Sequence, residues 1–521
     1  MRRSPFPGAR AGLAALSLLL CVLSLPGGPL PLLALVSLVP LGLALCDASR
    51  TECLVYAYVC GFLGWLESTG DLASGLSMYA HLPRGEALLL VAAGCAWLAV
   101  PYGAFGLLYG TFQWMKGTGG ALRTAACLTL LVSVFPSPLP LDSSHSLYRF
   151  PILIQILDLG GQPFLLFALY LFNWLWVDVA LRIRQHRDYR SSSAWILGLS
   201  VFVAGYGCFR IAQCQGEEAQ HPPDRVLRIA VIQPDIPLGG DSNPHSEDAL
   251  NPFHTLLEMS AAVAAKDHSI ELVVWPETPT RITCEEDSIT RPELTALAVH
   301  YGVPFLINCV QPAPGGRDYN TELLLDRRRT YAYHKQRLFP FTEYIPGERW
   351  FPGLRALIPA VSRYAEGRDA TVFRIKGPLG VFPAICYEAL FPDHVRQFVG
   401  QGGNILISAA NDAWFGRSRI PEFAIAESVY QAIQYRIPVV RVSNSGDSLA
   451  VKASGKIVPG SRTAAFTNTA RIVEVFAPRA RAPYLALGNF FLYALAAGWL
   501  IAAALRAIHN HKLAGGHVDR V

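Results

Sequence analysis

The chain has 521 residues, of which 52% are apolar and only 16% are charged, and its formal net charge is +5. A soluble globular chain carries about 25% charged residues, so this chain has too little polar surface to be solvated by water along its whole length. The same composition excludes a disordered chain and a collagen-like one. The small positive charge is not gathered into a basic stripe, which argues against a nucleic-acid partner.

Apolar segments dominate the first 215 residues and the last 40. A helix that crosses a bilayer needs about 20 apolar residues, and eight runs reach or approach that length. We therefore predict about eight transmembrane helices, seven in an N-terminal membrane domain over 1–215 and one at the start of 484–521. The part between them, 218–483, has the mixed polarity of a globular domain. The eight runs are 11–26, 29–46, 53–69, 87–109, 121–139, 160–181, 194–213 and 484–505.

Basic residues in the short loops predict the orientation, because Lys and Arg are retained on the cytoplasmic side. With the N-terminus inside, thirteen basic residues fall in cytoplasmic segments and only Arg84 and Arg149 in the opposite loops. This places both termini in the cytoplasm and the polar domain outside it. The alternative for the first run is a cleavable signal peptide after Arg2 and Arg3, but no A-x-A-like site follows it.

Three carboxylates lie inside the apolar runs, namely Glu67, Asp158 and Asp178. Ionisable residues inside a membrane are candidate functional residues. Each of these lies near the edge of its run, so we predict that they sit at the membrane interface and do not form a transport pathway.

The polar part alternates between apolar strands and helices, which is typical of buried sheets covered by helices. Its 265 or so residues suffice for one well-buried domain. We predict strands at 227–233, 271–277, 304–310, 319–326, 381–388, 404–411 and 437–444, and helices at 252–265, 291–302, 392–401 and 423–436.

Cysteine usage leaves few candidates for a reactive thiol. Eight of the eleven cysteines lie in or beside apolar runs, where free cysteine behaves as a small hydrophobic residue. The other three are Cys284, Cys309 and Cys386. The absence of a CxxC pair and of a dense cysteine framework argues against structural zinc and against a disulfide-stapled fold. The sequence predicts no metal and no cofactor.

Three chemically active side chains follow apolar strands, at the strand ends where α/β sites collect. They are Glu277 in VVWPE, Lys335 in YHKQRLFPFTEYIPGE and Cys386 in ICYE. A thiolate needs a base for its proton and a positive partner for the oxyanion it generates, and Glu277 and Lys335 are candidates for these roles. The helix that begins shortly after Cys386 and the nearby ammonium of Lys335 are both expected to lower the pKa of the thiol. Glu343 is a candidate to hold Lys335, or a plain surface carboxylate. A core position for Cys386 is the alternative for the thiol.

Two aromatic segments are candidates for contact with lipid. In 348–364 the apolar residues, among them Trp350 and Phe351, recur at roughly helical spacing between arginines, as in a helix that lies at a bilayer interface. An ordinary core-facing helix is the alternative, and Pro352 and Pro359 would break a long one. Trp414 and Phe415 lie in the second segment, which we interpret as a pocket wall.

The Glu, Lys and Cys segments, together with SAANDAWFG (408–416), resemble in order and context the motifs of the carbon–nitrogen hydrolase (nitrilase) superfamily. A nitrilase-like domain after seven spans and before an eighth is similar to the apolipoprotein N-acyltransferase family. The resemblance covers nearly the whole chain, although the spans match by layout more than by residue. Further matching segments are IAVIQPDIP (229–237), YNT (319–321), NDAWFG (411–416), RVSNSG (441–446) and PYLALGN (483–489).

The resemblance implies a fold, a reaction and roles for residues. The fold is an α-helical membrane bundle that carries an αββα sandwich. Glu277 is implied as general base, Lys335 as oxyanion-stabilising group and Cys386 as nucleophile. The supporting positions are Glu343, Tyr387, Glu388 and Asn320. The implied location is the bacterial inner membrane, with the catalytic domain on the periplasmic face.

The implied reaction moves an acyl chain from a phospholipid, through a thioester on Cys386, to the α-amino group of a diacylglyceryl apolipoprotein. Alternatives are a membrane-anchored amidase of the nitrilase type, a related acyltransferase with another amine acceptor, and a transporter or scaffold with an inactive hydrolase domain. Two departures from the family stand out. The segment 237–250 has no Trp after the first strand, and Thr342 replaces the usual Gly before Glu343.

Overall fold

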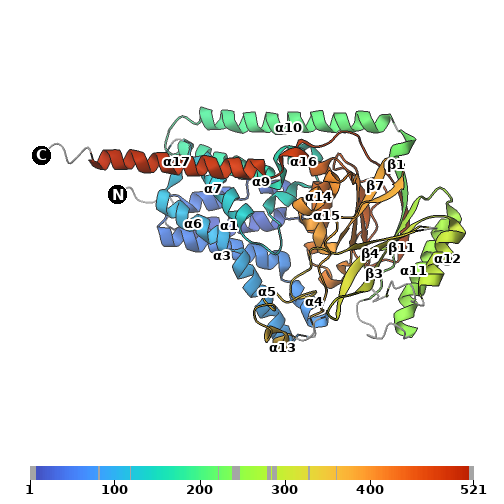
Figure 1. Ribbon diagram of the computed structural model, residues 1–521. Helices are drawn as coiled ribbons and strands as arrows, with labels where there is room; N and C mark the ends of the chain where they lie inside the picture. The colour runs from blue at the N-terminus through green and yellow to red at the C-terminus, as the bar shows by residue number, and fades with distance from the viewer. Residues whose placement is uncertain are drawn as a thin grey trace.

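The computed structural model describes residues 8–79, 82–117, 119–220, 222–237, 247–277, 283, 290–326, 329–358 and 361–515. The segment 238–246, which covers most of the stretch without the family's Trp, and Cys284 lie outside these residues. Figure 1 shows two parts, a bundle of helices at the left and a pair of sheets with their covering helices at the right. The long helix α10 runs along the outside of the bundle and leads toward β1.

The bundle is built from the apolar runs, and all eight predicted runs coincide with helical segments. Three of the described helices are long and apolar enough to cross a membrane by length and composition: 84–116, Leu157–Arg184 and Arg190–Ala219. The count of eight spans stays a prediction. The helices of the bundle are α1 (Arg10–Ser24), α2 (Val39–Leu45), α3 (Arg50–Thr69), α4 (Leu72–Tyr79), α5 (Arg84–Leu98), α6 (Val100–Phe112), α7 (Gly120–Val134), α8 (Pro151–Ile154), α9 (Leu157–Arg184), α10 (Arg190–Ala219), α16 (Pro483–Leu487) and α17 (Phe490–Gly515).

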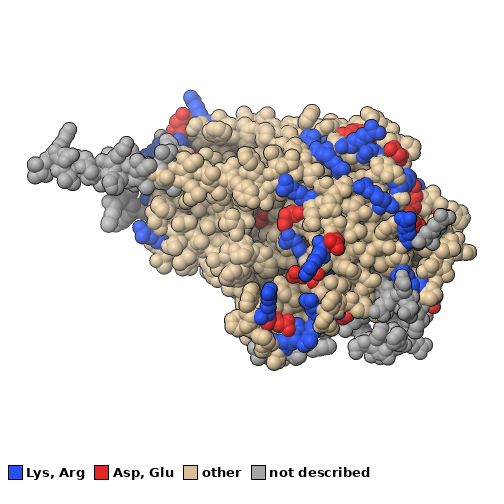
Figure 2. Space-filling model, viewed as in Figure 1, with Lys and Arg blue, Asp and Glu red and all other residues tan. Residues whose placement is uncertain are grey.

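Charged side chains are distributed unevenly between the two parts, as expected of a membrane protein. The face in Figure 2 is almost free of them across the helical part, apart from a few at the end away from the sheets, and carries many over the sheet-bearing part. An apolar belt of this kind is what lipid chains solvate.

Local sequence explains several helix boundaries. Ser49 begins α3 with a capping box, in which its side chain accepts from the Glu52 amide and Glu52 accepts from the Ser49 amide. Gly161, with φ of 69°, and Pro163 kink α9 near its start. A Cβ at Gly161 would lie 2.5 Å from the ring of Tyr484 in α16, so only glycine fits there.

Two sheets stack face to face. The six-stranded sheet has the order β11-β1-β2-β3-β4-β5, with β1, β2 and β3 parallel, and the five-stranded sheet has the order β10-β9-β8-β7-β6, with β7, β8 and β9 parallel. The strands are β1 (Val226–Gln233), β2 (Leu272–Val274), β3 (Phe305–Ala313), β4 (Arg317–Leu325), β5 (Thr330–His334), β6 (Phe373–Lys376), β7 (Leu379–Ile385), β8 (Ile405–Ala410), β9 (Val439–Ser443), β10 (Leu449–Val451) and β11 (Thr469–Phe476).

Helices cover the outer face of each sheet, so the layers are αββα. Val231 and Val274 meet Val381 and Ile407 in the apolar core between the sheets. The six-stranded sheet is covered outside by α11 (Glu247–Lys266) and α12 (Thr290–Tyr301), and the five-stranded sheet by α14 (Pro392–Gly400) and α15 (Ile420–Tyr435). All six residues of β8 are buried, as expected of a parallel strand covered on both faces.

Most predicted strands and helices are confirmed, and the errors are local. The strands β5, β6, β10 and β11 were not predicted, because they lie at or next to sheet edges and carry weak apolar patterns. The predicted strand 381–388 ends at Ile385, where a 3₁₀ turn, η5 (Cys386–Leu390), begins.

The predicted amphipathic helix over 348–364 is wrong as a continuous helix. Within the described part of this segment, 348–358 and 361–364, only α13 (Leu354–Leu357) is helical, and prolines disfavour a longer helix. Val361, expected on the lipid face, is buried in the protein. Trp350 and Phe351 are 76% and 67% exposed, which fits an outward aromatic segment without helical order.

Two buried charge clusters join α15 to the bundle. Asp158 in α9 is fully buried and pairs with Arg210 of α10 and Arg436 at the end of α15. Its position at the membrane interface stays a prediction. His145, also fully buried, lies 2.9 Å from Glu427 of α15 through Nε2. These contacts fix the position of the sheet-bearing part relative to the helical bundle.

Candidate active site

The predicted trio comes together where strands of the two sheets end. Glu277 lies three residues beyond β2, Lys335 directly follows β5, and Cys386 directly follows β7. The sheets face each other, so these ends meet over one site. The structure thus brings together three side chains that are far apart in the sequence.

Lys335 is the centre of the polar cluster. Its side chain is almost fully buried, and Nζ lies 2.9 Å from Oε1 of Glu343 and 3.2 Å from Oε1 of Glu277. Nδ2 of Asn320 donates to the same two oxygens, over 3.0 Å to Glu277 and 3.2 Å to Glu343. Burial lowers the pKa of Lys335, but the charges of Glu277 and Glu343 outweigh it, so the pKa lies well above its ordinary value and the ammonium is retained.

Cys386 is held in a conformation that exposes its sulfur to this cluster. Its φ is 52°, in the left-handed region that a non-glycine residue rarely adopts. Such strain costs about 1–3 kcal/mol and persists only where the surroundings enforce it. The sharp turn from β7 into η5 therefore presents the thiol at the strand end.

The thiol itself is not activated as the sequence led us to expect. Burial raises the pKa of Cys386, and the charge of Glu277 raises it further, as do Asp412 and a hydrogen bond to Glu277. Lys335 lowers it by less, so the pKa lies well above its ordinary value. The expectation of a lowered thiol pKa is wrong, because desolvation of the partly buried sulfur and the charges of two carboxylates outweigh one ammonium.

Glu388 enforces the turn at the nucleophile. This buried carboxylate accepts four hydrogen bonds. Three come from the backbone N–H groups of Ile385 at 2.8 Å, Gln336 at 2.6 Å and Arg337 at 3.1 Å, and the fourth comes from the Tyr333 hydroxyl at 2.7 Å. It ties the chain before Cys386 to the chain after Lys335. The predicted supporting role of Glu388 thus has a structural basis in these four bonds.

Tyr387 joins the nucleophile turn to the bundle. Its hydroxyl donates to the carbonyl of Pro138, in the connection between α7 and α8, and its ring packs edge-on against Phe339 and Phe391. Tyr387, the residue next to Cys386 in the chain, therefore fixes the position of the sulfur relative to the helical bundle.

The prediction missed a second ion pair beside the thiol. Asp412, at the end of β8, accepts from Nη2 of Arg441 at 2.7 and 2.6 Å and from Ser443 at 2.9 Å, and its charge acts on Cys386. Both residues lie in segments that carried the family resemblance, NDAWFG and RVSNSG, so the signal was present. No spacing rule connects the two segments.

The aromatic candidates divide into two groups. Trp350 and Phe351 are exposed on the loop after Glu343, and Phe341, two residues before Glu343, is also exposed. Trp414 and Phe415 are partly buried in η6 (Asp412–Phe415), which packs closely against Gly75 of α4. Thr342 directly precedes the buried Glu343, and its hydroxyl donates to Pro340.

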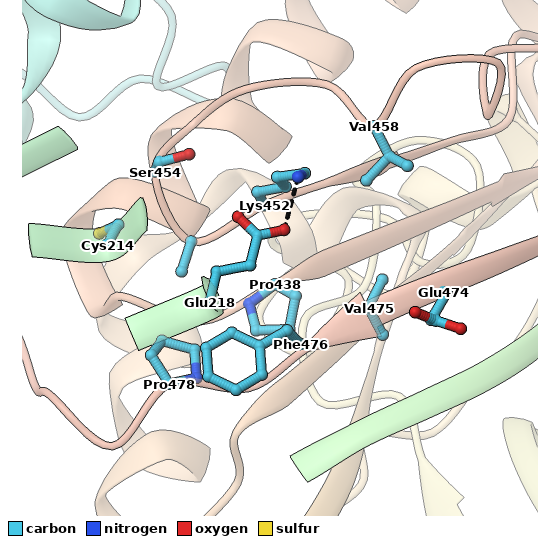
Figure 3. A pocket seen from close by; sticks show the side chains of 11 residues that line it. Cys214, Glu218, Pro438, Lys452, Ser454, Val458, Glu474, Val475, Phe476 and Pro478 are labelled. Atoms are coloured by element: carbon cyan, nitrogen blue, oxygen red, sulfur yellow. Dashed lines mark hydrogen bonds and ion pairs between the residues drawn. The ribbon is translucent and has the colours of Figure 1, made fainter. Parts of the chain in front are cut away.

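A small pocket lies at the amino-terminal end of β9, at the end of the strand away from the Lys335 cluster. Pro438, before β9, lines it together with the Lys452–Glu218 ion pair and Cys214 of α10 (Figure 3). None of the predicted site residues lines it. Among the described residues, no group of three or more His, Cys, Asp and Glu side chains is placed to hold a metal ion.

The fold and the cluster together define a carbon–nitrogen hydrolase domain. Residues 228–480 match the family described as carbon-nitrogen hydrolase. The apolipoprotein N-acyltransferase of Rhizobium leguminosarum bv. trifolii is 27% identical, over 76% of this chain and 77% of its own. That of Geobacter metallireducens is 25% identical, over 86% of this chain and 83% of its own. The chain is thus similar over most of its length to apolipoprotein N-acyltransferases, in agreement with the resemblance seen in the motifs.

Solved structures were also compared. Saccharomyces cerevisiae Nit3, a member of branch 10 of the nitrilase superfamily, aligns with a TM-score of 0.37 and 15% identity, over 50% of this chain and 93% of its own. An amidase from Nesterenkonia sp. aligns with a TM-score of 0.37 and 17% identity, over 52% of this chain and 96% of its own.

Proposed function

We propose that this protein is a membrane-embedded enzyme that transfers an acyl chain from a phospholipid to the α-amino group of the N-terminal diacylglyceryl-cysteine of an apolipoprotein. One observation carries the proposal. Glu277 and Lys335 converge on Cys386 in a chain that is similar, over most of its length, to apolipoprotein N-acyltransferases. The product is a triacylated lipoprotein, and the chemistry calls for neither metal nor cofactor.

In the first half-reaction, Sγ of Cys386 attacks the carbonyl carbon of a phospholipid ester. The resting thiol is protonated, so the S–H proton passes to Glu277 as the S–C bond forms. Lys335 and backbone N–H groups of η5 stabilise the oxyanion. The ester C–O bond then breaks, Glu277 returns the proton to the leaving lysophospholipid oxygen, and a thioester remains on Cys386.

In the second half-reaction, the α-amino nitrogen of the lipoprotein attacks the thioester carbonyl. Glu277 accepts a proton from the amine, the C–S bond breaks, and the proton returns to the sulfur. The new amide leaves with the acyl chain, and the thiol is restored. Two half-reactions that share one covalent intermediate predict ping-pong kinetics.

The charge arrangement favours this use of the trio. Lys335 stays cationic between Glu277 and Glu343. When Glu277 takes the thiol proton it becomes neutral, so Lys335 turns its charge toward the sulfur or the oxyanion while Glu343 holds it in place. The total charge of the buried cluster does not change, which keeps the electrostatic cost of the step small.

We place the substrates at the membrane side of the site. Both are lipids, so a site at the depth of the acyl chains supplies proximity, and a dry pocket protects the thioester from water. The exposed Trp350 and Phe351 are proposed to contact lipid chains, and Trp414 and Phe415 to line the acyl pocket. The presence of apolar helices that can cross a membrane supports this placement.

We assign the protein to the bacterial inner membrane, with 218–483 as the periplasmic catalytic domain and both termini in the cytoplasm. The excess of basic residues in one set of loops supports this orientation. Cys309, in β3, is disulfide-bonded, and disulfides persist in the oxidising periplasm and not in the cytosol.

The test uses purified protein in detergent with a phospholipid and a diacylated lipopeptide. We expect the lipopeptide to gain the mass of one acyl chain, and Cys386 to carry that acyl group when the peptide is left out. Cys386→Ala is the control for both signals, with unfolding monitored by tryptophan fluorescence. If small soluble amides are hydrolysed and no acyl adduct forms, the enzyme is an amidase and the proposal fails. A Cys386→Ala variant that retains the function would point to a transporter or scaffold.

A further inference from the structure

A buried carboxyl group next to the Lys335 cluster has no part in the proposed chemistry. Glu322 lies on β4, two residues after Asn320 and on the same face, and is fully buried between the sheets. Its register partners are Asn308 on β3 and Tyr333 on β5. Among the described residues, neither of its carboxyl oxygens has a hydrogen-bond partner of standard geometry. A buried polar group in this state costs stability, so its presence calls for a reason.

Two amides connect this carboxyl group to the site. Nδ2 of Asn308 donates to Oδ1 of Asn320 over 2.8 Å. Asn320 in turn donates from Nδ2 to Glu277 and Glu343, at 3.0 and 3.2 Å. The carboxylates require the amide nitrogen of Asn320 on their side, which leaves its oxygen to accept from Asn308. The orientation of one amide therefore depends on that of the other.

The side-chain amide of Asn308 also faces Glu322. A neutral carboxylic acid pairs with an amide in both directions, because its O–H donates to the amide oxygen and its carbonyl accepts from the amide N–H. A carboxylate lacks the donor. Only the neutral acid can therefore hold the oxygen of Asn308 on one side and leave an N–H for Asn320 on the other.

The surroundings of Glu322 keep it neutral. Burial raises the pKa of Glu322, and the charges of Glu277 and Glu388 raise it further, while the Asn308 amide lowers it by less, so the pKa lies well above its ordinary value. On the neighbouring strand, the hydroxyl of Tyr333 is occupied by its bond to Glu388. The cation of the cluster, Lys335, is engaged by Glu277 and Glu343.

We propose that Glu322 is a positioning residue which, as a neutral acid, orients Asn308 and through it the Asn320 amide that holds Glu277 and Glu343 around Lys335. The role rests on the proposed function only in that this cluster is the catalytic one. Ionisation of Glu322 would remove the donor and add a negative charge beside Glu277, so the arrangement requires the protonated form.

The test compares four substitutions in the full-length protein. Glu322→Gln keeps the length and neutrality and supplies an N–H donor, Glu322→Met keeps the length without hydrogen bonding, and Glu322→Asp keeps the acid but withdraws it from Asn308. Thr321→Val is the matched control, because Thr321 is a buried polar neighbour on the same strand that bonds His334 on the opposite face. The readout is the rate at which iodoacetamide alkylates Cys386, followed by mass spectrometry. This rate reports on the site without any acyl substrate.

We expect Glu322→Gln and Thr321→Val to alkylate within about twofold of the unmodified protein. Glu322→Met is expected to fold with nearly unchanged stability, since loss of the pairing with Asn308 is offset by removal of a buried carboxyl group. Its alkylation is expected to slow by roughly tenfold, because Glu277 is no longer held to receive the proton. Glu322→Asp is expected to be equally slow, and it keeps the test valid if the Met variant fails to fold.

Either of two results overturns the proposal. The first is an unchanged rate in Glu322→Met or Glu322→Asp, and the second is a Glu322→Gln variant as slow as these. N-acylation of the lipopeptide is measured in parallel. If the unmodified protein alkylates as described but transfers no acyl chain, the proposed function fails while the positioning role stands.

Discussion

The buried cluster around Asp158 gives the sharpest prediction for stability. Oδ2 of Asp158 accepts from Nε of Arg210 at 2.7 Å, and from Nε and Nη2 of Arg436 at 2.9 and 2.5 Å. Oδ1 accepts from the hydroxyl of Tyr206 at 2.7 Å. One carboxylate thus compensates two guanidinium groups, of which Arg436 is only 1% exposed.

The substitution Asp158→Ala leaves both arginines in the protein interior without an anion. Breaking a buried ion pair from one side costs about 3–5 kcal/mol, because the remaining charge stays uncompensated. Among the residues that the structure describes, Arg436 keeps only Gln155 and the carbonyl of Ala453 as oxygen partners, so we expect the loss to lie at the upper end of that range. The assay is denaturant unfolding in detergent micelles, followed by tryptophan fluorescence.

A matched control separates burial from the mere presence of an ion pair. Glu218 of α10 pairs with Lys452, also across the boundary between bundle and sheets, but the two side chains are 28% and 35% exposed. Glu218→Ala is expected to cost less than about 1 kcal/mol. Replacing Asp158, Arg210 and Arg436 together by Leu, Met and Met should restore most of the lost stability. Equal midpoints for Asp158→Ala and Glu218→Ala would refute the reasoning.

Three further variants test the site and its supports. Glu388→Gln should cost about 2–3 kcal/mol of unfolding free energy and most of the transferase activity, since in either orientation its amide nitrogen would face at least one backbone N–H donor; a variant of full stability and activity contradicts this. Burial lowers the pKa of His145, but hydrogen bonds to Asp142 and Glu427 outweigh burial and raise the pKa from 6.5 to about 10. The stability that protonated His145 contributes is therefore complete below pH 6.5 and is lost as the pH rises through about 10. His145→Leu should lack this alkaline loss of stability in thermal melts taken across that range. Lys335→Met should fold yet form no acyl adduct on Cys386. An adduct seen by mass spectrometry would show that Lys335 is not needed to stabilise the oxyanion.

The sequence was sufficient to predict which side chains the fold brings together at the candidate site. Strands and helices alternate strongly enough that the ends of the strands before Glu277 and Cys386 could be placed to within a few residues. Lys335 and Glu343, which no periodicity singles out, were candidates by their charge, and the family motifs implied their roles. The bonds of Lys335 to both carboxylates agree with that prediction.

What the sequence could not supply is the balance between opposing effects. The thiol of Cys386 lies near a cation and at the start of a helical turn, and both favour the thiolate. Its charge state also depends on burial and on two anions, one of which, Asp412, reaches the site from another strand. Asp158 is a similar case, because its partner Arg436 lies 278 residues away in the chain. Such pairings are set by the tertiary fold and leave no local pattern.

The raised pKa of the nucleophile has a consequence for how the enzyme avoids wasteful chemistry. A standing thiolate would be open to oxidation and to any soluble electrophile. A neutral thiol hydrogen-bonded to Glu277 becomes nucleophilic only as its proton leaves, and that step gains from an oxyanion beside Lys335. The thiol is therefore most reactive toward an acyl carbonyl that lies between the sulfur and the ammonium. Since the proposed acyl donor is a membrane lipid, the same geometry that fixes the sheets to the helices, through Asp158 and Tyr387, decides which carbonyls can reach that position.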